Sequence, residues 1–452
     1  MEGRVEIPSS YREMARAFFL SLFASGETTL SPLPRCAGTE ALMAFIKSHF
    51  QKVRREGDAL VVTGTGSFAG NGLPQEIDIG DHPEFLEGLF PLFFHRGALF
   101  KGNVQALRPR FRRALKQLEG AGFSFSLQER GSLFHLEVMK SSPNAVEVEF
   151  ERAEETVRNM TLLALLSAAT GENRIVEGVP FRSELDTLLH GFKASFVAHH
   201  KGDAAVGPEE DEAETNELEK RIRRLQTKKE KSGEKPLRVL HIHETVPLRA
   251  ATLTLPGDPL LAAPFLLSGL LIGNSVMTVS GPAPDSLSAL LNAFRRMGGP
   301  IETVSEKGRD MPIWVARTGR LTGRRISGEL TASLGELFPF VALAAAYADG
   351  QSVIRDALFL REGATDLISA TLHNLKAMGV KVGEIDDGLV IEGAREYDGG
   401  EFDTFGEPAL GLAMSVAAAK NKGESIIRNA EAIDQVWPDF HFCFQECYSG
   451  VE

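Results

Sequence analysis

One pattern recurs along this chain of 452 residues at a nearly constant period. Apolar stretches of helix length begin at intervals of 70, 72, 103, 78 and 71 residues. In five of the six copies a glycine-containing turn and a β-branched strand follow, and the earlier copies then continue into a second amphipathic helix. Self-similarity at a fixed period indicates an internally repeated fold. The six starts are Glu13, Pro83, Glu155, Asp258, Glu336 and Glu407.

The fifth copy shows the unit most clearly. Glu336 to Tyr347 is apolar on almost every side, so it predicts a helix that other elements cover completely. A second helix is predicted from Asp366 to Met378, where leucine, isoleucine and methionine recur at helical spacing and Gly379 follows as a cap. Two short apolar runs flank Asp387-Gly388, which predicts a β-hairpin. The predicted unit is therefore helix, strand, helix and hairpin.

The one long interval contains a highly charged insertion. Residues 209–235 carry nine acids and eight bases among 27 residues, without an aromatic side chain. Such a composition cannot bury a core of its own. We consider two interpretations: a solvated insertion that loops out between two repeats, or an arm that docks a protein partner.

Composition limits the class of protein. A chain of this length is expected to form two or more domains. The net charge of −12 argues against a nucleic-acid partner, and no apolar run reaches the 18 residues that would predict a membrane span. Three cysteines without zinc-site spacing predict no metal site, and we expect no cofactor. Because Arg16 interrupts the first apolar run, we expect no secretory signal and a cytoplasmic location.

Six short motifs, in order, resemble those of the EPSP synthase (3-phosphoshikimate 1-carboxyvinyltransferase) family and other enolpyruvyl transferases. Pro8 to Ala17 (PSSYREMARA) resembles the opening PGSKSxSxRA, and Leu255 to Leu267 (LPGDPLLAAPFLL) resembles PGDxSSAAFFL. The resemblance covers nearly the whole chain outside 201–236. The other matches are Phe294 to Gly298 with LRxMG, Glu336 to Pro339 with DxxP, Ile354 to Gly379 with a strand and an RxKExDR helix, and Trp437 to Phe440 with FPxF.

This resemblance implies an α/β (α+β) fold of two lobes, each with three βαβαββ units, arranged as an inside-out α/β barrel. The chain would cross between the lobes near Pro8 and near Pro256. Lobe one would then comprise residues 9–256, with a charged insertion at 201–236, and lobe two residues 1–8 plus 257–452. In the family, small anionic substrates bind in the cleft between the lobes, which close over them.

The resemblance also implies a chemistry: transfer of a carboxyvinyl group from phosphoenolpyruvate to shikimate 3-phosphate, in aromatic amino acid biosynthesis. Both substrates are polyanions, so the cleft needs several cations. This chain departs from that pattern. Its Ala364 stands at the catalytic glutamate and Gly363 at the neighbouring lysine. Four more cations that would face phosphoenolpyruvate are neutral here: Tyr11, Leu367, Ala409 and Gln435.

The resemblance assigns the candidate site residues. Glu336 is the catalytic candidate, in the place of an aspartate. Structural roles are the alternatives: an N-cap for Asp258, an ion pair at the lobe hinge for Arg16, a favourable helix-dipole contact for Glu336 and a loop anchor for Arg361. The candidates for substrate binding are Ser10, Tyr11, Arg12, Arg16, Arg108, Asp258 and Arg361.

Three hypotheses about function remain. The first is a working EPSP synthase or close transferase. The second is an enzyme of the same fold that acts on a different anionic substrate with rearranged residues. The third is a non-catalytic relative, a pseudoenzyme, that binds a ligand through the cleft or a protein partner through 209–235. Fold alone does not choose among them.

Overall fold

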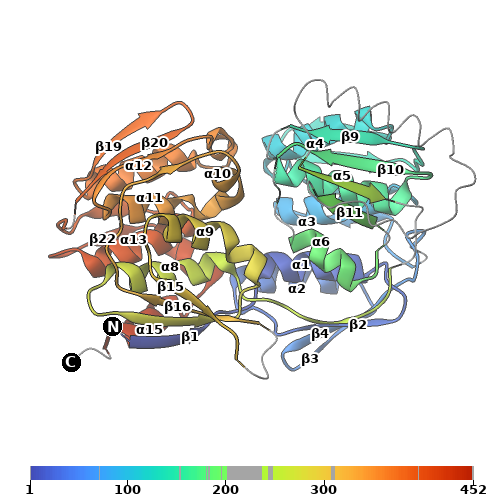
Figure 1. The fold of residues 1–452 in the computed structure, drawn as a ribbon. Helices are drawn as coiled ribbons and strands as arrows, with labels where there is room; N and C mark the ends of the chain where they lie inside the picture. The colour runs from blue at the N-terminus through green and yellow to red at the C-terminus, as the bar shows by residue number, and fades with distance from the viewer. Residues whose placement is uncertain are drawn as a thin grey trace, which may run out of the picture.

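The computed structural model describes residues 2–449, apart from 71, 152–153, 180, 182–183, 195, 201–236, 243–247, 307–310 and 395. The charged arm predicted at 209–235 therefore lies outside the described residues. The described chain forms two lobes that stand side by side and are joined along one edge (Figure 1). Each lobe contains its own hydrophobic core.

Lobe one consists of three four-stranded sheets with the same strand order. In each sheet a parallel strand pair is extended by an antiparallel hairpin. Two helices accompany each sheet. The sheets are β13 (Thr252–Thr254), β2 (Glu27–Ser31), β4 (Ala59–Thr63) and β3 (Val53–Glu56); β5 (Glu76–Asp78), β6 (Ala98–Asn103), β8 (Leu133–Val138) and β7 (Phe125–Arg130); and β9 (Glu147–Phe150), β10 (Asn173–Glu177), β12 (Arg238–Ile242) and β11 (Phe196–His200). The helices are α1 (Tyr11–Ser21), α2 (Ala37–His49), α3 (Pro83–Leu89), α4 (Pro109–Gly120), α5 (Glu155–Ala168) and α6 (Glu184–Gly191).

Lobe two repeats this architecture, with a shorter last unit. Its sheets are β1 (Glu2–Glu6), β14 (Val276–Ser280), β16 (Ile313–Arg317) and β15 (Ile301–Val304); β17 (Arg325–Ile326), β18 (Gly350–Ile354), β20 (Gly388–Gly393) and β19 (Lys381–Ile385); and β21 (Glu401–Asp403) with β22 (Ile426–Arg428). Its helices are α8 (Pro259–Leu271), α9 (Pro284–Arg296), α10 (Glu329–Leu334), α11 (Phe338–Ala346), α12 (Leu367–Ala377), α13 (Pro408–Lys420), α14 (Glu431–Val436) and α15 (Phe440–Ser449), with short 3-10 turns η3 (Gly335–Leu337) and η4 (Leu358–Glu362).

The last unit differs from the predicted copies because two described strands, rather than four, form its sheet. After β22 the chain turns into α14 and α15 instead of a hairpin. Phe440 and Phe444 are buried in the lobe-two core, and α15 packs on β1. The closing helix therefore covers a strand from the opposite end of the chain.

The predicted insertion lies inside the third unit, not between two repeats as we expected. β11 and β12 are antiparallel neighbours, with His200 opposite Arg238. The segment 201–236 therefore connects the two strands of a hairpin. Helical spacing predicted the second helix of this unit from Asp186 to Phe196. The observed helix ends earlier, at Gly191, and Lys193 has a φ of 57° before β11 begins.

In each lobe one edge strand comes from a segment that is distant in sequence from its neighbour. β1 pairs in parallel with β14, and β13 pairs in parallel with β2. One core contains residues from Met14 to Leu255, whereas the other contains Val5, Ile7 and residues from Leu260 onward. On this basis we propose 9–256 and 1–8 plus 257–452 as the two domains.

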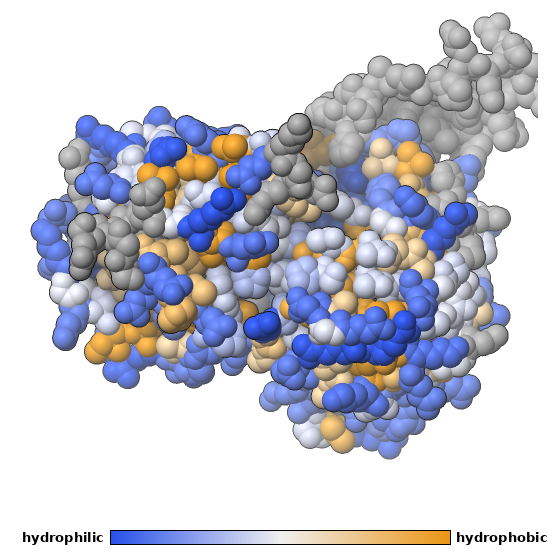
Figure 2. Space-filling view, turned by 90° about the horizontal axis from the view of Figure 1, so that it is seen from below, coloured by the Kyte–Doolittle hydropathy of each residue, from blue (hydrophilic) through white to orange (hydrophobic). Residues whose placement is uncertain are grey.

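Helix α11 of lobe two is apolar throughout. Every residue of α11 is buried, as the unbroken apolar pattern predicted. Glu329–Ala346 is long and apolar enough to cross a membrane by length and composition, but 72% of it is buried inside the structure. The underside of the molecule, which carries β1, β3 and β4, shows hydrophilic residues between small groups of apolar ones (Figure 2).

Candidate functional site between the lobes

The two crossings of the chain are tied together by Ser10 and Asp258. Ser10 caps α1 and its backbone N–H donates to the carbonyl of Pro256 at 2.9 Å. Its hydroxyl donates to the Asp258 carboxylate at 3.1 Å, and that carboxylate accepts from the backbone N–H of Leu260 at 2.9 Å. Asp258 is therefore the N-cap of α8, which is its structural interpretation. Burial, reinforced by the nearby Glu336, raises the pKa of Asp258.

Arg12 and Glu336 form an ion pair between the lobes. Arg12 lies in the first turn of α1, and its Nη2 is 2.9 Å from Oε2 of Glu336 in η3. The Glu336 carboxylate raises the pKa of Arg12 more strongly than burial lowers it, and Glu155 and Asp258 add to the effect. The catalytic candidate thus has a cation directly beside it, supplied by the opposite lobe.

Arg16 pairs with acids of its own lobe. Its two terminal nitrogens lie 3.0 Å from Glu13 and 3.3 Å from Glu155. Burial opposes the charge of Arg16, but these two carboxylates raise its pKa overall. The ion-pair role predicted for Arg16 matches this geometry, with both partners at the N-terminal ends of α1 and α5.

Tyr11 stands where the family resemblance places a lysine. Its hydroxyl donates to Oε1 of Glu84 at 3.3 Å, in the first turn of α3. Its ring packs on Gly38 so closely that a Cβ there would lie 2.8 Å from the ring carbons. Burial, and then the Glu84 charge, raise the pKa of Tyr11, so the hydroxyl stays neutral.

Arg108 faces a carboxylate that our candidate set omitted. Arg108 precedes α4 as its N-cap residue, and Glu407 precedes α13 in the same way. Burial raises the pKa of Glu407, and Glu336 raises it further, whereas a Thr365 hydrogen bond and the charges of Arg108 and Arg110 oppose the rise. Glu407 was recognisable as one of the six helix starts, but that pattern gave no sign that it would lie near Glu336.

Arg361 is a loop anchor and does not join the group around Glu336. Its Nη1 lies 2.7 Å from both Asp366 and Glu384, which are both in the fifth unit. Its remaining nitrogens donate to the carbonyls of Asp386 and Ile385 at 2.9 and 3.0 Å. Asp366 in turn caps α12 through two backbone N–H groups. The arginine therefore fixes the turn between β19 and β20.

The four positions with missing cations offer no replacement charge. Leu367 and Ala409 are buried in the lobe-two core. Gln435 is exposed on α14, which packs against α2. The fourth position, Tyr11, is described above. Ala364, which stands at the catalytic glutamate, is exposed in the turn before α12. Arg12 therefore supplies a cation in direct contact with Glu336.

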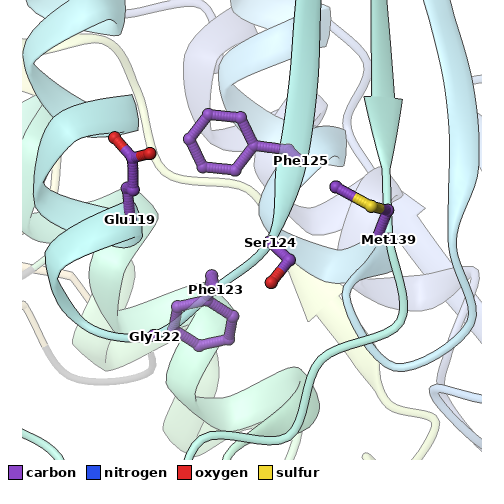
Figure 3. Close-up of a pocket in the computed structure, with 6 residues that line it drawn as sticks. All are labelled: Glu119, Gly122, Phe123, Ser124, Phe125 and Met139. Atoms are coloured by element: carbon purple, nitrogen blue, oxygen red, sulfur yellow. The ribbon is translucent and has the colours of Figure 1, made fainter.

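A small hollow of about 290 Å³ lies elsewhere, in the second unit (Figure 3). Polar and apolar residues line it: Glu119 at the end of α4, Gly122 to Phe125 leading into β7, and Met139 directly after β8. Among the described residues no group of three or more His, Cys, Asp or Glu could hold a metal ion. The arginines and carboxylates between the lobes are therefore the candidate site.

Comparisons with known proteins agree on one family. The family model described as EPSP synthase (3-phosphoshikimate 1-carboxyvinyltransferase) matches residues 209–442, more than half of the chain. The chain is 24% identical to the 3-phosphoshikimate 1-carboxyvinyltransferase of Geobacter metallireducens, over 97% of this chain and 95% of that protein. It is 25% identical to the protein of that name from Pelobacter propionicus, over 100% and 97%.

Solved structures share the fold. The EPSP synthase of Acinetobacter baumannii superposes with a TM-score of 0.76 at 17% identity, covering 99% of this chain and 95% of that one. The enolpyruvyl transferase NikO of Streptomyces tendae superposes with a TM-score of 0.69 at 13% identity, covering 98% and 94%. The predicted two-lobed fold is confirmed.

Proposed function

The chain belongs to the EPSP synthase family, and on this premise we propose that it binds and acts on a small anionic ligand between its lobes. The family chemistry needs cations for two polyanions, and here several of the family's cation positions hold neutral residues. We assign the ligand to the start of α4 in lobe one, beside Arg108, and the catalytic role to Glu336 in lobe two. The proposed reaction differs from carboxyvinyl transfer.

The environment of Arg108 carries this proposal. It lies at the N-terminus of α4, near Glu407, but forms no ion pair with any described carboxylate. Its neighbours Arg110 and Arg113 are paired with Glu87 and Glu154. An arginine left without a bidentate partner beside a helix N-terminus favours an anion such as a phosphate or carboxylate.

The surroundings of the replaced residues disfavour phosphoenolpyruvate. A charge-assisted hydrogen bond contributes about 1.5–3 kcal/mol, so losing several removes most of the affinity for a polyanion. Tyr11 cannot substitute for lysine, because its neutral hydroxyl already donates to Glu84. Ala364 cannot transfer a proton. Glu336 can, once an incoming anion draws Arg12 away from it.

Carboxyvinyl transfer to shikimate 3-phosphate is the second candidate. The full-length match to proteins of that name favours it, as does the retention of an acid at Glu336. On that alternative the chain would serve aromatic amino acid biosynthesis. Protein binding through 209–235 rests on its charge pattern alone. A cytoplasmic location is a further proposal, consistent with free Cys36, Cys443 and Cys447.

Thermal shift and product assays separate these candidates. Inorganic phosphate, phosphoenolpyruvate and shikimate 3-phosphate are each titrated into the protein, because a ligand of the folded state raises its Tm. We expect a phosphate-bearing anion to raise the Tm. Arg108→Gln should raise the Kd of that anion about ten-fold or more, because a charged contact is lost. Arg112→Gln is the matched control: it lies on the same helix but pairs with Glu129.

The contrary outcomes are distinct. Phosphate release from phosphoenolpyruvate with shikimate 3-phosphate, at a rate well above the protein-free background, would overturn the proposed change of substrate and restore the second candidate. No Tm shift with any of the three anions would contradict anion binding in the cleft. An equal loss of anion affinity in Arg108→Gln and Arg112→Gln would contradict binding at Arg108 and place the site elsewhere on α4.

A further inference from the structure

The hollow in the second unit combines a carboxylate with apolar walls. It measures about 290 Å³, and its lining includes Glu119, Ser124, Phe125 and Met139. Figure 3 shows Glu119 and Met139 on opposite sides of the opening, with the Phe125 ring between them. We propose that this hollow binds a primary organic ammonium group, whose charge meets Glu119 while its hydrocarbon chain lies against Phe125 and Met139.

The end of α4 concentrates negative charge at this hollow. The last carbonyls of a helix carry a partial negative charge, so a lysine or arginine is favourable in its final turn. α4 has no basic residue in its last turn, and Glu119 lies there instead. Within the described part of the chain, no ion pair joins Glu119 to a cation, and the arginines of α4 pair with other carboxylates. An ammonium group would neutralise both the carboxylate and the helix end.

The aromatic walls of the hollow are held in place by the lobe-one core. Phe125 packs against Phe90, with ring centroids 5.9 Å apart. Phe123 is 2% exposed, and its ring lies 4.6 Å from that of Phe94. A cation is attracted to the face of such a ring, and an alkyl chain packs on it. Because the rings are already ordered, a ligand binds there with little loss of side-chain freedom.

The turn between α4 and β7 leaves one hydroxyl available to the ligand. Gly122 has a φ of 90°, and its N–H donates to the Glu119 carbonyl at 3.0 Å, which ends the helix. The Ser124 backbone is hydrogen-bonded on both sides, to the Ser141 hydroxyl and to the N–H of Met139, each at 3.0 Å. Its hydroxyl has no partner among the described residues. A primary ammonium carries three donors, which suit this hydroxyl and the Glu119 carboxylate.

Size and charge define the class of ligand. Pockets for drug-sized molecules measure about 300–1,000 Å³, so this hollow suits a short alkylammonium or the end of a lysine side chain. A carboxylate or phosphate would be repelled by Glu119 and by the helix end. The site is distinct from the anion site proposed at Arg108, which lies at the other end of α4, roughly 16 Å away along the helix. The proposal therefore does not depend on what the inter-lobe site binds.

Methyl NMR of the whole chain, labelled at methionine, tests the proposal. n-Butylammonium is the probe, n-butanol is its neutral analogue, and Nα-acetyl-lysine methylamide presents the same group on a peptide unit. We expect n-butylammonium to shift the Met139 methyl signal along a saturable curve, with Met139→Leu identifying that signal. Glu119→Gln and Phe125→Leu should each raise the Kd about three-fold or more, and n-butanol should bind the wild type more weakly by a similar factor. Thermal melting checks that each variant is folded.

Glu302→Gln and Phe442→Leu are the matched controls, because they make the same changes at an exposed carboxylate and an exposed ring of lobe two. Both should leave the Kd unchanged. Tighter binding of the lysine amide would identify a protein lysine as the source of the group, and tighter binding of n-butylammonium a free amine. The proposal is refuted if the Met139 signal does not move, if n-butanol binds as tightly as n-butylammonium, or if Glu302→Gln weakens binding as much as Glu119→Gln does.

Discussion

At the scale of single residues, Arg12, Arg16 and Arg361 pair with carboxylates inside the structure, whereas Arg108 has no such partner among the described residues. Arg158 is the clearest example outside the cleft, because its side chain is completely buried. It makes two hydrogen bonds to Asp186, at 2.7 and 2.8 Å, and one to Glu177 at 2.8 Å. Arg238 adds a second cation to the same carboxylates. This cluster joins α5, α6 and two strands of the third unit.

We predict that Arg158→Met destabilises the protein by about 3–5 kcal/mol, because it leaves buried carboxylates short of a partner. Urea unfolding at neutral pH measures the loss, with Arg54→Gln, expected to cost at most about 1 kcal/mol, as the exposed control. Burial alone would raise the pKa of Asp186, but Arg158 and Arg238 lower it overall.

A lowered folded-state pKa fixes the sign of the pH dependence. The stabilisation by Asp186 is present above its unfolded pKa of about 3.9 and is lost as pH falls through the lower folded value. Arg158→Met should flatten this acid limb. An Arg158→Met protein as stable as the wild type at neutral pH would contradict the prediction.

Asp258 should behave in the opposite way, because burial raises its pKa. Ionisation of Asp258 therefore destabilises the folded state. The stability that the protonated form contributes is present below the unfolded pKa of about 3.9 and is lost as pH rises through the higher folded value. Asp258→Asn keeps a good N-cap and removes the charge, so we predict a higher Tm at neutral pH. Asp258→Ala loses the cap as well and should be lower than Asp258→Asn by about 1 kcal/mol. Equal stability of the two variants would argue against the capping role.

At the scale of elements, the hairpin β11–β12 explains how a 36-residue segment, 201–236, is accommodated. Its flanking strands are antiparallel neighbours, so the chain can leave and return without moving either strand. Loop length itself adds little to the free energy of closure. The insertion therefore costs the third unit little, whatever its role.

We predict that replacing 201–236 by Asn-Gly leaves the fold intact and changes the stability by about 1 kcal/mol or less. Circular dichroism and urea unfolding measure this. A matched replacement within β12 itself should unfold the unit, since Leu240 and Ile242 are fully buried. Loss of structure in the Asn-Gly variant would show that the insertion stabilises lobe one.

At the scale of the whole molecule, each end of the chain completes a unit that is distant in sequence. β1 pairs with β14 and also contacts α15. Gly3 of β1 is so close to Cys447 of α15 that a Cβ at Gly3 would lie 2.9 Å from the Cys447 Sγ. Residues near both termini thus belong to lobe two. In lobe one, the edge strand β13 comes from the segment just before the second crossing and pairs with β2.

We predict that deleting residues 1–6 weakens lobe two and leaves lobe one largely unchanged. Val5 lies in the lobe-two core, and the exposed edge of β14 would lose its hydrogen bonds. Hydrogen exchange should therefore accelerate in β14 and α15, while α5 and β6 keep their protection. Equal acceleration in both lobes would contradict the separate cores.

The repeating units could be predicted from the sequence, because apolar spacing, caps and turns act over a few residues of chain. The six predicted helix starts lie at or within two residues of the beginnings of α1, α3, α5, α8, α11 and α13. The pairing of charges became visible only in the folded molecule. The partners in the pairs Arg12–Glu336 and Arg113–Glu362 are more than 240 residues apart. Arg361 instead donates to groups of its own unit. Such pairing depends on how whole lobes pack, which local patterns do not encode.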